Sequence, residues 1–261
     1  MILLLLLIIT FSPMHQITFK QILQLCQAVE ASKKIIDSAD ASAKHSLRPL
    51  RSLSNALTAH ALRSNATWPY VTLPNFDIQS TDSLEERVGA ELILFAPLVP
   101  RTERRAWEKY SMENQGWVAE DLQNRGLDDV NPGDISDEIY DVVDRDDGAN
   151  FYVPLWQIGP VPTNVEVINL DLYSHPSFRR MIDDAFEVKH ILLSEVINQD
   201  VLASSISALA HLSQYENPRS YAVQPVLDSF GKNASVVGFI FAVVSHELFV
   251  QIPITSADVL F

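Results

Sequence analysis

The sequence contains a single cysteine, Cys26, among its 261 residues. An intramolecular disulfide is therefore excluded, and we interpret Cys26 as a small apolar residue on a helix face. A disulfide between two copies, across paired N-terminal helices, is the alternative. The sequence also lacks an excess of basic residues, because its formal net charge is −14. An acidic surface repels nucleic acid, so we expect no nucleic-acid partner.

Short motifs of common enzymes are also missing. There is no His-Glu-x-x-His pair, no Gly-x-Ser-x-Gly turn and no glycine-rich phosphate loop. Asp171 and His175 are four residues apart, but Pro176 interrupts the helix that would align them on one metal. The histidines are otherwise dispersed, which also disfavours a secreted hydrolase with a clustered Ser/His/Asp site. The sequence thus predicts no catalysis, no metal site and no cofactor within this chain.

Residues 1–14 begin with an apolar run from Met1 to Phe11. This run is shorter than the ~20 residues of a membrane span, and no basic residue precedes it as in a signal peptide. We interpret it as the outer half of a membrane helix; a signal peptide and a buried apolar segment are the alternatives. Basic residues are in excess up to residue 68, where they suit a membrane surface. Two sequons, at Asn65 and Asn233, are compatible with glycosylation on the extracellular or lumenal side.

Residues 15–66 are expected to form a helical stalk. Up to residue 64 this stretch has no glycine and one interior proline, Pro49. Leucines recur at helical spacing on the C-terminal side of Pro49, so we predict one helix kinked there, or two helices. The apolar stripe favours a homodimer through the stalk, or equally packing against the chain's own domain.

Residues 67–252 have an α+β pattern of PAS-like type, in which antiparallel strands are flanked by helices. We predict strands at 92–99, 150–158, 165–170, 191–194, 222–230, 236–244 and 248–252, and helices at 102–117 and 176–189. Residues 253–261 would add a short terminal strand.

Residues 119–150 are rich in acidic side chains, ten of which fall between Asp121 and Asp147. A calcium loop with Gly148 at its sixth position is excluded by spacing, because Val143 and Arg145 would occupy ligand positions and Pro154 would replace the bidentate glutamate. We therefore interpret this segment as a solvated acidic excursion.

Several short motifs occur in an order that resembles one family. They are Pro97-Leu98-Val99, Arg104 to Glu108, Tyr152-Val153-Pro154, Asn169 to Asp171, Pro225-Val226 and Val237-Gly238. This order resembles the CHASE-like extracytoplasmic sensors of receptor-type class III nucleotide cyclases. The Trp68-Pro69 pair and the Pro154-Leu155-Trp156-Gln157 segment are closer to an algal group of these receptors.

The resemblance implies a membrane-anchored sensor, single or tandem PAS-like in fold, that controls a cyclase domain lying outside this chain. PAS-like sensors enclose small ligands between the sheet and its flanking helices. We therefore predict an unidentified small-molecule ligand and a pocket whose lining residues are Tyr152, Trp156, Gln157, Asn169, Asp171 and Pro225. Trp107 is expected to be core, and Glu108 to pair with a nearby arginine. The alternative is a degenerate, ligand-free dimerisation module whose pocket is filled by its own side chains.

Overall fold

The computed structural model describes residues 26, 29–30, 32–34, 47–80, 90–127, 135–142, 148–162, 165–195 and 219–245. Residues 46–253 form one compact unit, and residues 1–45 with 254–261 belong to a separate one. The predicted stalk up to residue 46 and the terminal strand at 253–261 lie almost entirely outside the described residues, so both stay predictions. No helix of the described residues is long and apolar enough to cross a membrane.

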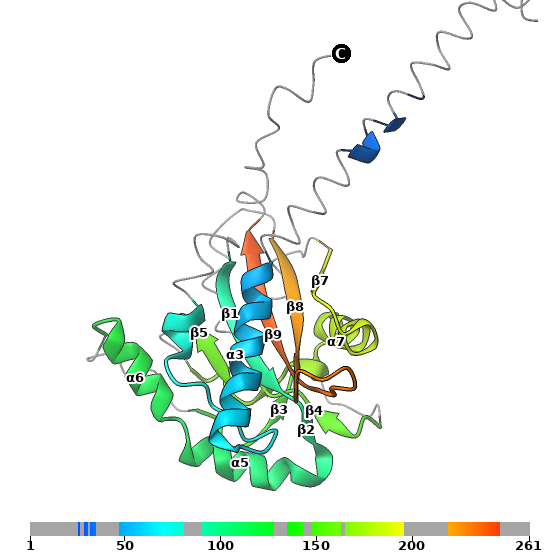
Figure 1. Cartoon of the computed structure of the whole chain (residues 1–261). Coiled ribbons are helices and arrows are strands. Elements are labelled where there is room, and N and C mark those ends of the chain that lie inside the picture. The colour runs from blue at the N-terminus through cyan, green and yellow to red at the C-terminus, as the bar shows by residue number, and fades with distance from the viewer. Residues whose placement is uncertain are drawn as a thin grey trace, which may run out of the picture. The chain divides into compact units, whose positions relative to one another are not determined.

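A five-stranded antiparallel sheet lies at the centre of the main unit (Figure 1). Its strand order is β5 (Gln157–Gly159), β1 (Ala90–Pro97), β9 (Val236–Ser245), β8 (Arg219–Leu227) and β7 (Leu192–Leu193). The central strands are long apolar runs that are buried almost throughout. Such runs fit strands covered by helices on both faces of a sheet.

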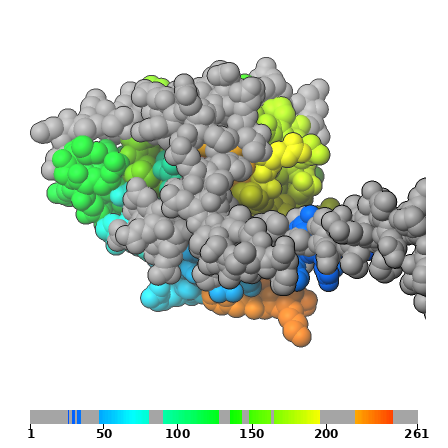
Figure 2. Space-filling view, turned by 90° about the horizontal axis from the view of Figure 1, so that it is seen from above, coloured from blue at the N-terminus to red at the C-terminus, as the bar shows by residue number. Residues whose placement is uncertain are grey.

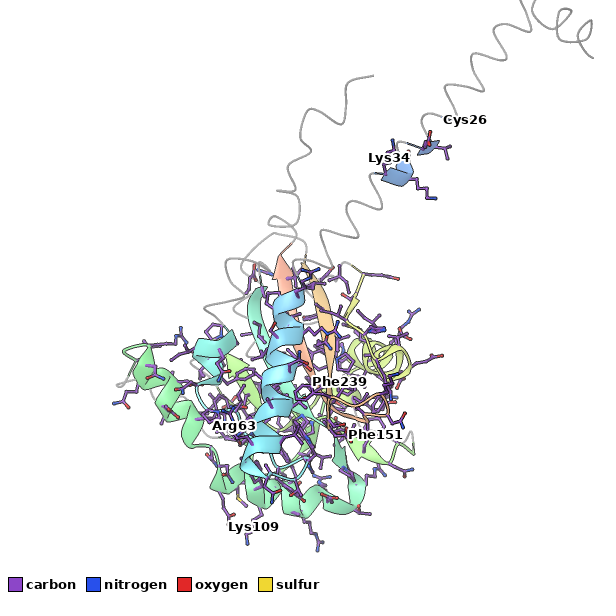
Figure 3. All side chains as sticks on the ribbon, viewed as in Figure 1. Cys26, Lys34, Arg63, Lys109, Phe151 and Phe239 are labelled. Atoms are coloured by element: carbon purple, nitrogen blue, oxygen red, sulfur yellow. The ribbon has the colours of Figure 1, made fainter. Side chains whose placement is uncertain are left out.

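Helices α3 (Arg48–Ser64) and α7 (Pro176–Val188) cover opposite faces of this sheet (Figures 1 and 2). On the α7 face, Phe178 contacts Phe241 at a ring-centroid distance of 5.3 Å, and Phe186 contacts Phe239 at the same distance. Figure 3 shows Phe239 close to Phe151, whose ring lies 5.7 Å from that of Phe186. The amphipathic pattern of 176–189 therefore predicted both the helix and its buried face.

Helix α3 begins at Arg48 with Pro49 in its first turn, where proline is tolerated because its missing N–H has no partner in the helix. It ends at Asn65, which adopts a left-handed conformation with φ 53°. Ser54 Oγ donates to Pro225 O at 2.9 Å, and Thr58 Oγ1 donates to Leu227 O at 2.7 Å. Strand β7 pairs with β8 only at Ala222 and Val223 and does not reach these two carbonyls. The bonds from Ser54 and Thr58 therefore satisfy them and attach α3 to β8.

Strands β1 and β9 approach closely at Gly238. A Cβ atom there would lie 2.9 Å from Ala96 O and 3.2 Å from Phe95 Cε2. Any larger residue would therefore push apart two central strands, which accounts for glycine after Val237.

The remaining elements are α5 (Arg104–Glu113), α6 (Gly116–Asn124) and short pieces around them. These pieces are β2 (Val99–Pro100), η1 (Arg101–Glu103), β3 (Tyr140–Asp141), β4 (Phe151–Tyr152), β6 (Leu170–Asp171) and η2 (Leu172–Ser174). Strand β2 pairs antiparallel with β4, and β3 pairs parallel with β6.

Four sequence predictions need correction. The strand predicted over 150–158 is interrupted at 153–156, and its two ends are the separate strands β4 and β5, which belong to different sheets. Residues 165–169 form a turn instead of a strand, because Ile168 N bonds to Val165 O and Asn169 is left-handed with φ 70°. Strand β8 starts earlier than predicted and ends at Leu227, where Asp228 Oδ1 accepts from Ser235 N and closes a hairpin. The helix predicted over 102–117 breaks at Asn114, whose side chain bonds back to Tyr110 O.

Candidate functional site

Five of the six predicted lining residues lie on two segments that run side by side. Leu155 N donates to Leu170 O, Asn169 N donates to Leu155 O, and Leu172 N donates to Val153 O, each at 2.8–3.0 Å. These bonds bring residues 152–157 next to 169–171. Pro225 lies elsewhere, on β8, which is separated from β5 by two strands.

Asn169 is fully buried and uses its whole amide side chain within the fold. Its Oδ1 accepts from Trp107 Nε1 at 3.1 Å, and its Nδ2 donates to Ser111 Oγ at 3.0 Å and to Ser136 O at 2.7 Å. One amide thus joins α5, the 135–139 segment and the turn before β6. This geometry is that of an internal crosslink.

Trp156 lies at the centre of an aromatic cluster. Its ring centroid is 5.4 Å from that of Trp107, 6.0 Å from Tyr110 and 5.9 Å from Trp117. Its Nε1 donates to Thr72 Oγ1 at 3.0 Å, and the side chain is fully buried. The indole therefore fills the space between the sheet and helices α5 and α6.

Gln157 holds the loop before the sheet. Its Oε1 accepts from Leu73 N at 2.8 Å and its Nε2 donates to Leu73 O at 2.9 Å. Both polar groups of the amide are thus bonded to the backbone of one residue, Leu73, in the way that a neighbouring strand would bond to it.

The other three predicted residues also make internal contacts. Asp171 Oδ1 accepts from Val153 N at 2.8 Å and from Tyr173 N at 3.1 Å. The ring of Tyr152 lies under the guanidinium groups of Arg101 and Arg104, at 5.6 and 5.3 Å. Pro225 offers its carbonyl to Ser54, as described above. A ligand-binding role for the six residues stays a prediction.

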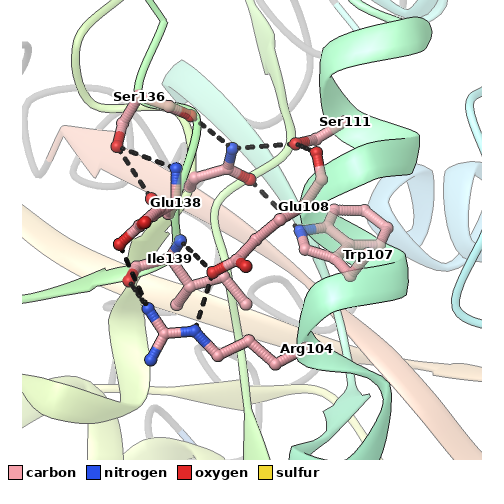
Figure 4. A network of polar contacts seen from close by, with 8 residues as sticks. Arg104, Trp107, Glu108, Ser111, Ser136, Glu138 and Ile139 are labelled. Carbon is pink, nitrogen blue, oxygen red and sulfur yellow. Dashed lines mark hydrogen bonds and ion pairs between the residues drawn. The ribbon is translucent and has the colours of Figure 1, made fainter.

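The Arg104–Glu108 pair binds a backbone unit (Figure 4). Arg104 Nε donates to Glu108 Oε1 at 2.7 Å, as the sequence led us to expect, and Arg104 Nη2 donates to Ile139 O at 2.6 Å. Glu108 Oε1 also accepts from Ile139 N at 3.1 Å. The family-like spacing of these two residues is therefore explained by recognition of the Ile139 peptide. Trp107, beside them, is fully buried core, as expected.

Asp171 and His175 do not form a metal pair. His175 is the N-cap of α7, where its Nδ1 accepts from Ser177 N at 3.3 Å, and Asp171 caps the preceding turn. Within the described residues, no group of three or more His, Cys, Asp or Glu side chains is arranged to hold a metal ion.

The sequence analysis missed a buried acid, Asp121. It lies on α6 and is 0% exposed, so the interpretation of 119–150 as a solvated excursion is wrong at this end. In the part of the chain that the structure describes, neither of its carboxylate oxygens has a hydrogen-bond partner. Trp117, one helical turn earlier and also buried, has an indole N–H that finds no acceptor among the same residues. Each such group costs about 1–3 kcal/mol unless an occupant satisfies it.

Asp77 faces Asp121 from a helical turn at 76–80. That turn packs closely on β5, because a Cβ at Gly159 would overlap Ser80 Oγ and lie 3.3 Å from Asp77 Cα. Burial, and then the negative charge of Asp77, raise the pKa of Asp121 to about 7. The Asp77 backbone N–H lies near the carboxylate without hydrogen-bond geometry to either oxygen. It and the charge of Arg125 lower the pKa of Asp121 less strongly, and Glu120 raises it further.

We predict that the Asp121→Asn variant loses part of the pH dependence of stability. An acid whose folded pKa is raised above its unfolded value, near 4, destabilises the fold as pH rises through 4 to 7. The wild type should lose up to about 4 kcal/mol relative to the variant over this window, at about 1.4 kcal/mol per pKa unit. Urea unfolding at pH 4.5 to 8 measures the difference, with Asp184→Asn, an exposed acid on α7, as control. Equal pH profiles for the wild type and both variants would contradict the prediction.

His175 changes the stability of the fold with pH in the direction opposite to Asp121. The Asp121→Asn substitution leaves this contribution unchanged. Burial lowers the pKa of His175, so its folded pKa lies below its unfolded value of 6.5. Its contribution to stability is therefore lost as pH falls below ~6.5, because the charged imidazole can no longer accept from Ser177 N.

Comparisons with known proteins place the described domain in one family. A search of curated proteins found no match. Among solved structures, one described as a methyl-accepting chemotaxis protein X is similar, with a TM-score of 0.39 and 11% sequence identity. The match covers 88% of this chain and 65% of the length of that structure. The family model of the CHASE domain matches residues 73–258, which include the sheet, α5 to α7 and all six predicted lining residues. The chain therefore belongs to the CHASE domain family.

Proposed function

We propose that the chain is the extracytoplasmic ligand-sensing and dimerisation region of a membrane receptor that regulates a cytoplasmic nucleotide cyclase. A CHASE domain is an extracellular sensor module of receptors, and it is not itself catalytic. The family match over residues 73–258 carries the proposal. The finer parts, a homodimer through the N-terminal helix and a cyclase as output, rest on the family resemblance of the ordered motifs.

The attachment of α3 to the sheet supports a route for the signal. Ser54 and Thr58 bond to carbonyls of β8, so a shift of this strand on ligand binding would also move α3. Helix α3 is the C-terminal part of the predicted stalk at 15–66. A change in the packing of the stalk against a second copy would pass the signal to the membrane. Ligand binding then acts by favouring one of two arrangements.

The cyclase output is tested by sequencing the transcript on both sides of the codons for residues 1–261. We expect apolar segments of about 20 residues on both sides of the sensor, and a class III cyclase domain after the second. A reading frame that encodes a different type of output domain would contradict the cyclase and leave the sensor in place.

The location of the sensor is tested by glycosylation. Both sequon asparagines, Asn65 and Asn233, are exposed, and the hairpin that carries Asn233 projects from the molecule in orange in Figure 2. We predict that the full chain from a eukaryotic secretory host loses about two glycans' mass on treatment with an N-glycosidase.

Two variants assign the glycans. Thr67→Ala and Ser235→Ala each remove one sequon while leaving the asparagine and its backbone unchanged, and both side chains are exposed. Each variant should lose one glycan. An unmodified wild-type chain would count against an extracellular or lumenal location.

A second candidate function is a ligand-free dimerisation module. It is favoured by the internal contacts of Trp156, Gln157 and Asn169, which fill the predicted pocket with the protein's own side chains. The two candidates differ in whether any other part of the interior holds a ligand.

A further inference from the structure

A small group of buried polar atoms lies apart from the predicted pocket. It consists of the Asp121 carboxylate, the Trp117 indole N–H and the facing Asp77, which we call the α6 polar site. Exposed fractions are 0% for Asp121 and 4% for each of the other two residues. Because Trp117 and Asp121 are four residues apart on α6, they project from the same buried face of the helix.

The unmet hydrogen bonds of this site point to an occupant. Among the described residues, Asp121 Oδ1 and Oδ2 and Trp117 Nε1 have no hydrogen-bond partner, although buried polar atoms in native proteins nearly always have one. The site offers two acceptors from a carboxylate and one donor from an indole. An occupant that satisfies all three must carry donors and an acceptor close together.

Charge and shape narrow the chemical class. Asp77 and Glu120 add negative charge around Asp121, and Arg125 is the cation that opposes them in the electrostatics of Asp121. A protonated amine is therefore favoured over a neutral or anionic group of the same size. The ring of Trp156 lies 5.9 Å from that of Trp117 and nearly perpendicular to it at 73°, so the surroundings of the indole are apolar.

We propose that the α6 polar site binds a small primary ammonium compound that carries a neighbouring hydroxyl or carbonyl oxygen. The ammonium donates to the Asp121 carboxylate, and the oxygen accepts from Trp117 Nε1. This inference deepens the proposed sensor function and rests on it, since it names the ligand class and the place of binding.

The test uses the full chain and three probes of nearly equal size. Ethanolamine carries an ammonium and a hydroxyl, ethylene glycol is its neutral counterpart, and glycolate is its anionic counterpart. Indole N–H resonances in ¹H–¹⁵N NMR spectra follow the four tryptophans separately, and the Trp117→Phe variant assigns the signal of Trp117. We expect ethanolamine to shift this signal saturably, and the other two probes to leave it unchanged.

Variants decide whether the shift reports the α6 polar site. Asp121→Asn keeps the side-chain shape and should weaken ethanolamine binding by at least about tenfold, since a charge-assisted hydrogen bond is lost. Trp117→Phe should weaken it several-fold, measured by calorimetry. Asp184→Asn, an exposed carboxylate on α7, should have no effect. An unshifted Trp117 signal, or equal affinity in the wild type and Asp121→Asn, would overturn the inference.

The experiments distinguish two outcomes: that the α6 polar site does not bind the ligand, and that the proposed sensor function is wrong. If another metabolite stabilises the wild type and Asp121→Asn equally in a thermal-shift panel, the sensor function stands and the α6 polar site does not bind its ligand. If no metabolite acts and the chain stays monomeric at high concentration, the sensor proposal itself fails.

Discussion

Replacing Asn169 by alanine is expected to lower the free energy of unfolding by about 3–5 kcal/mol. The substitution removes three hydrogen bonds. It leaves the fully buried Trp107 Nε1 without its acceptor, at about 1–3 kcal/mol, and removes the Asn169 partner of the half-buried Ser136 O. It also places alanine at φ 70°, a left-handed conformation that costs about 1 kcal/mol more for alanine than for asparagine. Urea unfolding followed by circular dichroism measures the loss.

Asn75 supplies the matched control. It is also left-handed, with φ 51°, but it is exposed. Asn75→Ala should therefore cost only the conformational part, about 1 kcal/mol. Similar losses for the two variants would show that the Asn169 hydrogen bonds contribute little, and would reopen Asn169 as a ligand-binding residue.

Replacing Trp156 by alanine is expected to cost about 3–5 kcal/mol as well, but through a cavity. The indole is fully buried among Trp107, Tyr110 and Trp117, and its removal leaves space that these rings cannot fill without moving. Thermal and urea unfolding should both show the loss. The near-ultraviolet circular dichroism of the folded variant should also weaken, because the remaining rings lose their fixed packing.

Trp156→Phe separates packing from hydrogen bonding. Phenylalanine keeps most of the ring contacts and loses the bond from Nε1 to Thr72, so a cost of about 1–2 kcal/mol is expected. A side chain that mainly contacts a ligand would behave differently, since its truncation would weaken binding and leave the ligand-free protein nearly as stable. A small loss for Trp156→Ala would therefore support the pocket predicted from the sequence.

The sequence was most informative where hydrophobic periodicity was strong. The apolar runs at β1 and β9 and the amphipathic stretch of α7 predicted their elements to within a few residues. It was least informative at 165–169, where apolar residues are typical of a strand but Asn169 turns the chain. That turn depends on bonds from Asn169 to residues 58 and 33 positions away, which no local pattern contains.

In the candidate site, too, the sequence indicated some features and missed others. The motifs 152–157 and 169–171 were expected to line a ligand pocket. The structure brings them together as partners of each other and of α5, and their ligand-binding role stays a prediction. Asp121 was missed because its acidic surroundings suggested solvent. One signal was present: Trp117, Val118, Asp121 and Leu122 form a helical stripe, and Asp121 occupies an inward position of that stripe.

Native mass spectrometry of the full chain, secreted from a eukaryotic host, shows whether the chain is a dimer that holds a small ligand. A sensor that dimerises and holds a small amine predicts a dimer that carries extra mass beyond polypeptide and glycans, with the extra mass reduced in Asp121→Asn. A dimer without added mass would favour the ligand-free module. A monomer whose mass is fully explained by polypeptide and glycans would contradict the sensor account.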